Sequence, residues 1–157
     1  MEKRTGKDRR AGSKEQISTL VVTRTETLAL YADLAGRRPF SEEHGTARVL
    51  QRFCQALIDY TASAHFQLYR HMVEKQEKRT HLLQVAEQIF PRILETTAQI
   101  LEFNDKYEKP ALKGRTDELA DDLSHLGEVL ADRIQLEDQI IQAVHRDRRN
   151  ADRPITQ

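Results

Sequence analysis

Apolar residues recur at intervals of three and four along most of the chain, the spacing that places side chains on one face of an α-helix. No long stretch alternates strictly between apolar and polar residues, as a half-buried β-strand would. The pattern therefore predicts an all-α protein with four helices and no sheet. The expected helices cover residues 14–35, a second stretch ending near 72, 80–107 and 116–144.

Helix-breaking residues set the expected boundaries of the first two helices. Gly36 ends the first helix, because glycine is the usual residue just beyond a helix C-terminus. The second helix begins after Gly45, or after Ser41 with Glu42 and Glu43 in its first turn. The sequence leaves both starting points open.

The third and fourth regions carry signals of their own. Pro91 lacks a backbone donor and clashes with the carbonyl four residues earlier, so we expect a short helix, a break or kink near Phe90, and then a longer helix. Thr116 is the N-cap candidate of the fourth helix, with Asp117 and Glu118 placed favourably for its dipole. Connections this short predict an antiparallel up-and-down four-helix bundle with a kinked third helical region.

Both ends of the chain are basic and poor in apolar residues. Residues 1–14 hold six lysines or arginines and two acids, which gives a net charge of +4. We therefore expect a flexible basic arm over 1–14, a helical bundle domain over 15–146 and a flexible tail over 147–157. Pro154 argues against a helix that runs to the end of the chain.

Composition narrows the class of protein. The 157 residues include 25 basic and 25 acidic side chains, so the chain has the length of one domain and no net charge. The longest apolar run, Leu28–Ala32, is far below the ~20 residues that span a bilayer, and no secretory signal follows the basic start. These features predict a cytoplasmic protein with no membrane contact. Cys54, the single cysteine, excludes an internal disulfide and a CxxC zinc site.

One histidine pattern bears on metal or phosphoryl chemistry. Asp122 and His125 form a single Asp-x-x-His pair, whereas a metal centre in a helical bundle needs two Glu-x-x-His pairs and two more glutamates, so we expect no metal or cofactor. Ser124–Glu128 weakly resembles a histidine phosphotransfer motif, but Glu128 would repel phosphate where that motif has a lysine. Phosphotransfer through His125 is the alternative function, and we expect no enzyme.

Residues 115–138 are strongly acidic, with eight acids and two arginines, a net charge of −6. Such a surface suits a basic protein partner, but a solvated helix face is the favoured interpretation of the charge run alone. Arg133 and Glu137 interrupt the apolar stripe between Leu130 and Ile141, which predicts a partly buried pair. The residues leave open whether this pair fixes helix register or binds a ligand.

One face of the second helix lies off the main apolar stripe. Arg52, Asp59 and Phe66 share it, because seven residues make almost two helical turns. Small, polar and aromatic residues lie beside it: Gln55, Ala62, Ser63 and Tyr69. An aromatic anchor, a carboxylate and small neighbours are what a helix-docking interface uses. Alternatively, the helix is buried nearly all round and Phe66 and Tyr69 belong to the core.

Residues 53–69, FCQALIDYTASAHFQLY, resemble the signature of the Rsd/AlgQ family, bacterial regulators (anti-sigma factors) of the primary sigma factor, sigma-70. Segments 30–39 and 126–140 agree with the family in order and spacing, and the resemblance spans Lys14 to Val144. The chain departs from the family motif at Ala64, where the motif has glycine.

The resemblance implies a non-enzymatic helical bundle that binds region 4 of sigma-70, the domain that reads the promoter −35 element and docks on core RNA polymerase. It also implies a monomer in a one-to-one complex that shifts polymerase toward alternative sigma factors as growth slows. The expected contact is a groove formed mainly by the second and fourth helices. Its expected residues, beginning with the carboxylate of the family motif, are Asp59, Phe66, Tyr69, Ser63, Gln55, Glu128 and Asp132.

Direct DNA binding is a third hypothesis. Sequence-specific binding uses basic residues on an ordered recognition helix, whereas the basic excess here lies in the two tails. We therefore expect no specific nucleic acid partner.

Overall fold

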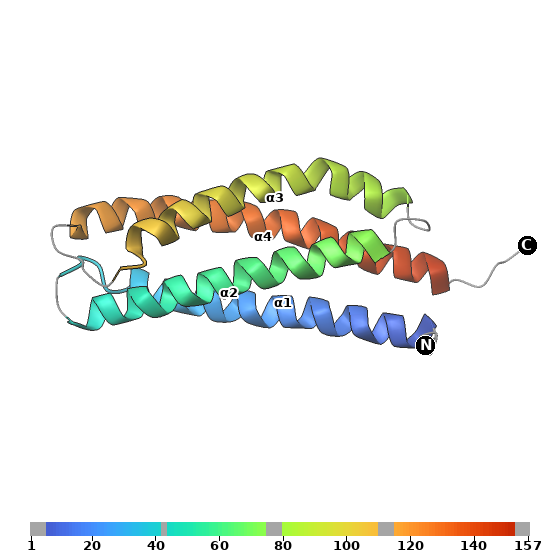
Figure 1. Cartoon of the computed structure of the whole chain (residues 1–157), viewed down its shortest axis with the longest axis horizontal. Coiled ribbons are helices and arrows are strands. Elements are labelled where there is room, and N and C mark those ends of the chain that lie inside the picture. Colours follow the sequence, from blue (N-terminus) through green and yellow to red (C-terminus); the bar gives the residue numbers. More distant parts are fainter. Residues whose placement is uncertain (1–5, 42–43, 75–79, 110–114, 153–157) are drawn as a thin grey trace, which may run out of the picture.

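Four helices that run alternately in opposite directions make up the computed structural model (Figure 1). They are α1 (Gly6–Ala35), α2 (His44–Glu74), α3 (Thr80–Tyr107) and α4 (Thr116–Asp152). The structure describes residues 6–41, 44–74, 80–109 and 115–152, with side chains for 17–41, 45–68, 70, 84–109 and 115–146. No strand occurs in these ranges, so the predicted all-α up-and-down bundle is confirmed. None of the described helices is long and apolar enough to cross a membrane.

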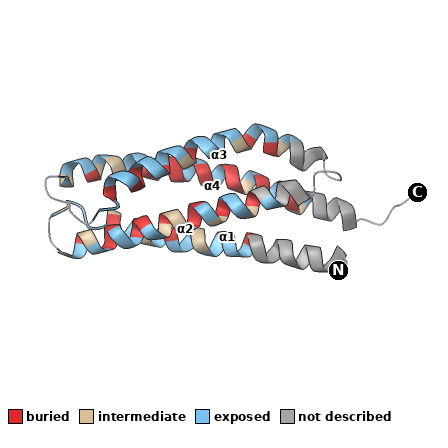
Figure 2. Ribbon diagram, in the orientation of Figure 1, coloured by how far each residue is buried: buried red, intermediate tan, exposed pale blue. Residues whose placement is uncertain are grey.

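The core lies along the inward faces of the helices, as the buried positions in Figure 2 show. Helix α2 packs between α1 and α3, and α3 packs on α4. The ring of Phe53 packs edge-on against Tyr31 of α1 at 5.9 Å and Phe103 of α3 at 6.0 Å between centroids. Fully buried side chains continue the core along the bundle: Leu20, Leu34, Leu57, Ile93, Ile100, Leu119 and Leu123.

The terminal helices extend into both predicted tails. Helix α1 begins at Gly6 instead of Lys14, and α4 continues to Asp152, past the predicted domain limit at residue 146. The apolar period defines only the core-facing part of a helix, whereas Lys, Arg and Ala extend it at little cost once a turn exists. The prediction that Pro154 prevents a helix to the end of the chain concerns residues outside the described ranges. Residues 1–5 and 153–157 lie outside the described residues.

Helix α3 passes through Pro91 as one helix, so of the expected break or kink near Phe90 the break does not occur. Pro91 and Glu87 are both exposed. The carbonyl that loses its helical donor, that of Glu87, therefore lies on the water-facing side, where solvent replaces the missing hydrogen bond.

The starts of α2 and α4 differ slightly from expectation. Helix α2 begins at His44, between the two predicted starts, and Glu42 and Glu43 lie outside the described residues. The N–H of Leu119 donates to the carbonyl of Arg115 at 2.9 Å, which makes Arg115 the N-cap residue instead of Thr116. Asp117 and Glu118 occupy the first turn of α4, as predicted.

Candidate functional site

The outer face of α2 carries the main predicted contact residues. Phe66 is 62% exposed, the largest exposed fraction among the described large apolar side chains, and Asp59 is exposed two turns before it. The guanidinium of Arg70 lies 5.7 Å from the centroid of the Phe66 ring. The buried positions Leu57, Tyr60 and Ala64 face the other way. Phe66 therefore belongs to the surface, and the alternative of a core position for it is wrong.

Polar neighbours support this face. Gln55 Nε2 donates to Asp59 Oδ1 at 3.4 Å, so one helical turn links the amide and the carboxylate. Ser63 is half-buried, and its hydroxyl accepts a hydrogen bond from Gln67 Nε2 at 2.9 Å. The side chain of Tyr69 lies outside the described residues.

The structure does not bring Glu128 and Asp132 to this face. Both are exposed on α4, whereas Leu126, Leu130 and Glu137 of the same helix point into the core. Among the described residues, α2 and α4 are joined in that core, where the Tyr60 hydroxyl donates to Glu137. Helices two apart in an up-and-down bundle occupy opposite corners. The predicted groove between α2 and α4 is therefore wrong, and the predicted residues form two separate surfaces.

A buried ion pair lies between these two surfaces. Arg133 and Glu137, one turn apart on α4, have no exposed side-chain surface, and Arg133 Nε donates to Glu137 Oε2 at 3.1 Å. Arg133 Nη1 also donates to the hydroxyls of Thr97 at 2.8 Å and Thr96 at 3.1 Å on α3. The predicted pair is confirmed and is completely buried.

Helices α1 and α2 complete the same network. The Tyr60 hydroxyl donates to Glu137 Oε1, and the Arg133 guanidinium carbon lies 5.6 Å from the centroid of the Tyr60 ring. Burial, followed by the neighbouring Glu137 carboxylate, raises the pKa of Tyr60, so the phenol keeps its proton and remains a donor. Arg24 of α1 approaches Glu137 Oε1 at 3.5 Å and donates to Asp138 Oδ1 at 2.9 Å. All four helices thus contribute a polar side chain to one buried site.

Sequence reasoning missed four members of this network: Arg24, Tyr60, Thr96 and Thr97. Their signal is weak, because threonines and a tyrosine are common on apolar stripes. One feature of the sequence could have indicated the network. Thr96 lies on the core stripe of α3, between Ile93 and Ile100, where its hydroxyl could accept a hydrogen bond from a buried arginine.

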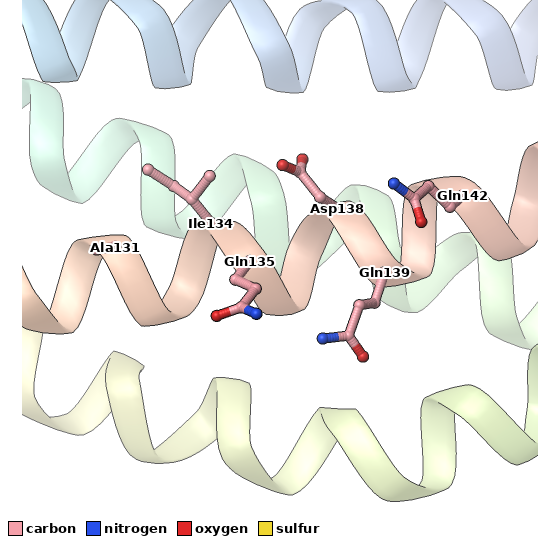
Figure 3. A pocket seen from close by; sticks show the side chains of 6 residues that line it. All are labelled: Ala131, Ile134, Gln135, Asp138, Gln139 and Gln142. Atoms are coloured by element: carbon pink, nitrogen blue, oxygen red, sulfur yellow. The ribbon is translucent and has the colours of Figure 1, made fainter.

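A shallow depression of about 450 Å³ lies on α4, where Asp138 points toward α1 and Gln135 and Gln139 point toward α3 (Figure 3). It is lined by Ala131, Ile134, Gln135, Asp138, Gln139 and Gln142. Among these residues only Asp138 is ionisable, and Arg24 already binds its carboxylate. The lining offers amide groups and a neutralised acid, with no nucleophile or proton-transfer pair.

The predicted Asp122–His125 pair does not converge. Asp122 Oδ2 accepts hydrogen bonds from Lys106 Nζ and from the Tyr107 hydroxyl, whereas Nε2 of the exposed His125 lies 3.0 Å from Gln99 Oε1. Burial alone would raise the pKa of Asp122, but the bonds from Lys106 and Tyr107 outweigh it and hold the pKa below 3.8. Across the described residues, no group of three potential metal ligands occurs.

Cys54 faces the core and is 4% exposed. Burial, with a smaller effect of Glu108, raises the pKa of its thiol to about 12. The thiol is therefore protonated at neutral pH, and a buried thiol of this kind is unreactive.

Comparison with known proteins gives one family. Residues 1–145 match the model of the family described as regulator of RNA polymerase sigma(70) subunit, Rsd/AlgQ. The chain is 33% identical to the regulator of sigma D of Yersinia pseudotuberculosis serotype O:1b over 135 residues, 83% of this chain and 80% of the relative. It is 30% identical to the regulator of sigma D of Enterobacter sp. strain 638 over 137 residues, 85% and 82% of the two chains. No solved structure matches the chain.

Proposed function

Because the chain belongs to the Rsd/AlgQ family of regulators of the RNA polymerase sigma(70) subunit, we propose that it is a non-catalytic anti-sigma factor that binds region 4 of sigma-70. In this proposal one molecule covers one region 4 and blocks its contacts with core polymerase and with the promoter −35 element. The protein thereby biases transcription toward alternative sigma factors.

The single observation that supports this proposal best is the exposed ring of Phe66 on the same helix face as Asp59. A large apolar side chain left in water, beside a carboxylate with adaptable polar neighbours, is the composition of a binding hot spot. We assign Gln55, Asp59, Ser63 and Phe66 to the contact, together with Tyr69 from its place in the family motif.

Charge supports the choice of a DNA-reading partner. Such domains are basic, and the stretch 115–138 of this chain carries a net charge of −6. Glu128 and Asp132 lie on the far side of the bundle from Phe66. We propose that they act by long-range attraction, which speeds encounter and sets orientation more than it adds affinity.

Titration calorimetry of this chain against isolated region 4 of the same organism's sigma-70 tests the proposal. We expect saturable one-to-one binding that weakens between low and physiological ionic strength. Asp59→Ala should raise Kd by about fivefold or more, equivalent to about 1 kcal/mol, with unchanged helical content. Asp33→Ala, another exposed aspartate but on α1 and outside the stretch 115–138, is the matched control and should bind like wild type.

Absence of binding by the wild-type chain would refute the proposal. Phosphotransfer through the exposed His125 would then be tested by incubation with a phosphorylated receiver domain, where acid-labile phosphohistidine is the expected product. A wild-type Kd for Asp59→Ala would show that the family carboxylate is not part of the contact.

A further inference from the structure

Helix α3 carries an apolar stripe that the preceding site leaves unused. Leu94 and Leu101 are 45% and 43% exposed, and they lie seven residues apart on one side of the helix. Phe90, four residues before Leu94, and Thr97, between the two leucines, are half-buried on the same side. The stripe is therefore continuous over three helical turns.

This stripe borders the outer face of α2. The Phe90 ring lies 5.7 Å from the ring of His65, and Phe103 of α3 contacts Phe53 at 6.0 Å. In antiparallel helices, these two contacts place Leu94 level with Ala62 and Leu101 level with Gln55. Along the bundle axis, Asp59 of α2 thus lies between the levels of Leu94 and Leu101 on the neighbouring helix α3.

The half-exposed apolar residues consequently form one surface across two helices, which we call the α2–α3 face. It consists of Ile58, Ala62 and Phe66 on α2 and Phe90, Leu94 and Leu101 on α3. Single exposed leucines are ordinary on a soluble protein, but a contiguous group of this kind marks an interaction site.

Unpaired carboxylates surround the α3 part of this face. Glu87, Glu95, Glu102 and Asp105 are exposed and make no ion pair among the described residues. In contrast, Glu118 and Asp122 of α4 are held by Lys106. Two copies of this face would bring acid against acid, which is unfavourable, whereas a basic partner would find an apolar centre inside a complementary rim.

We propose that the α2–α3 face is the docking surface for a basic amphipathic helix of the region 4 partner. Leu94 and Leu101 of α3 contact this helix in addition to the contact residues of α2. This inference rests on the proposed function and replaces α4 by α3 as the neighbour of α2 in the interface. The two leucines are about 10.5 Å apart along the helix axis, so they match apolar side chains one heptad apart on the incoming helix.

The test is calorimetry of wild type, Leu94→Gln/Leu101→Gln and Leu28→Gln against isolated region 4. Leu28 is 36% exposed on α1, so its variant is a matched control for losing a similarly exposed leucine. Gln has nearly the helix propensity of Leu, so all three proteins should unfold at similar temperatures. We expect the double variant to bind at least about tenfold more weakly than wild type and the control to bind like wild type.

The outcomes separate this inference from the proposed function. If Asp59→Ala binds weakly but the double variant keeps the wild-type Kd, region 4 is the partner and α3 is not part of the contact. If wild type does not bind region 4, both proposals are wrong. Sedimentation of the free chain tests a second copy as occupant: a dimer that the double variant abolishes would also overturn the assignment to a basic helix.

Discussion

Removal of both members of the buried Arg133–Glu137 pair should cost less stability than the sum of the two single removals. Glu137→Leu deletes the acceptor of Arg133 Nε, of the Tyr60 hydroxyl and of Arg24 Nη1. Arg133 then keeps only the bonds of Nη1, because Nη2 has no partner among the described residues. The variant therefore leaves a buried cation without its counter-charge.

The structure sets the size of each effect. Glu137→Leu should destabilise the fold by about 3–5 kcal/mol, the usual cost of an uncompensated buried charge. Arg133→Met should cost about 2–3 kcal/mol, because Glu137 retains the bonds from Tyr60 and Arg24. In the double variant the Tyr60 hydroxyl loses its acceptor, whereas the hydroxyls of Thr96 and Thr97 still donate to the Ile93 carbonyl, so the cost is about 1–3 kcal/mol. The double variant should thus lose at least about 2 kcal/mol less than the sum of the singles.

Urea unfolding followed by far-UV circular dichroism measures these free energies, with Tyr60→Phe added to the double variant as a further step. The third substitution removes the orphaned hydroxyl and should restore stability. Additive single effects would refute the argument, since they would mean that the two side chains do not share one network. A loss below about 1 kcal/mol for Glu137→Leu would mean that water solvates the pair.

Two further predictions concern contacts of α4 with its neighbours. Gly127→Ala would place Cβ 2.3 Å from the hydroxyl oxygen of Tyr31, which donates a hydrogen bond to the Leu123 carbonyl. We expect this clash to lower the free energy of unfolding by about 1–3 kcal/mol, measured by thermal melting. The loss should be smaller in a Tyr31→Phe background, which lacks that oxygen. Lys106 lowers the pKa of Asp122 in the folded protein. The ionised carboxylate therefore contributes its full stabilisation above pH 3.8, the ordinary pKa, and loses it as the pH falls through the lower pKa of the folded state. The stability gap between wild type and Asp122→Asn, measured by urea unfolding across this range, should therefore close in acid; a constant gap would contradict the assignment.

The helices were predictable because each buries one stripe, and the period of that stripe is visible in residues such as Leu119, Leu123 and Leu126. The ends of α1 and α4 were not, since a helix can continue past the last residue that packs. The passage of α3 through Pro91 depends on which side of the helix the proline faces, and that follows from packing.

The position of the candidate site was only half predictable. The outward direction of Asp59 and Phe66 follows from their offset to Leu57 and Ala64, and the structure agrees. The groove with α4 contradicted the predicted topology itself, because consecutive helices joined by short loops are neighbours and alternate helices are diagonal. Leu94 is exposed next to the buried Ile93, and apolar identity alone does not tell which of the two remains in water.

Adjacent residues of the family motif point to opposite sides of α2, so the proposed function assigns stability to Tyr60 and binding to Asp59. Asp59 points outward and Tyr60 inward, since consecutive positions on a helix are about 100° apart. The buried hydroxyl of Tyr60 donates a hydrogen bond to Glu137, 77 positions away in sequence. That contact fixes the rotation of α2 about its axis, and the same rotation determines where Asp59 stands on the surface. Loss of the Tyr60 bond should therefore weaken partner binding indirectly, whereas loss of Asp59 should leave the unfolding free energy unchanged.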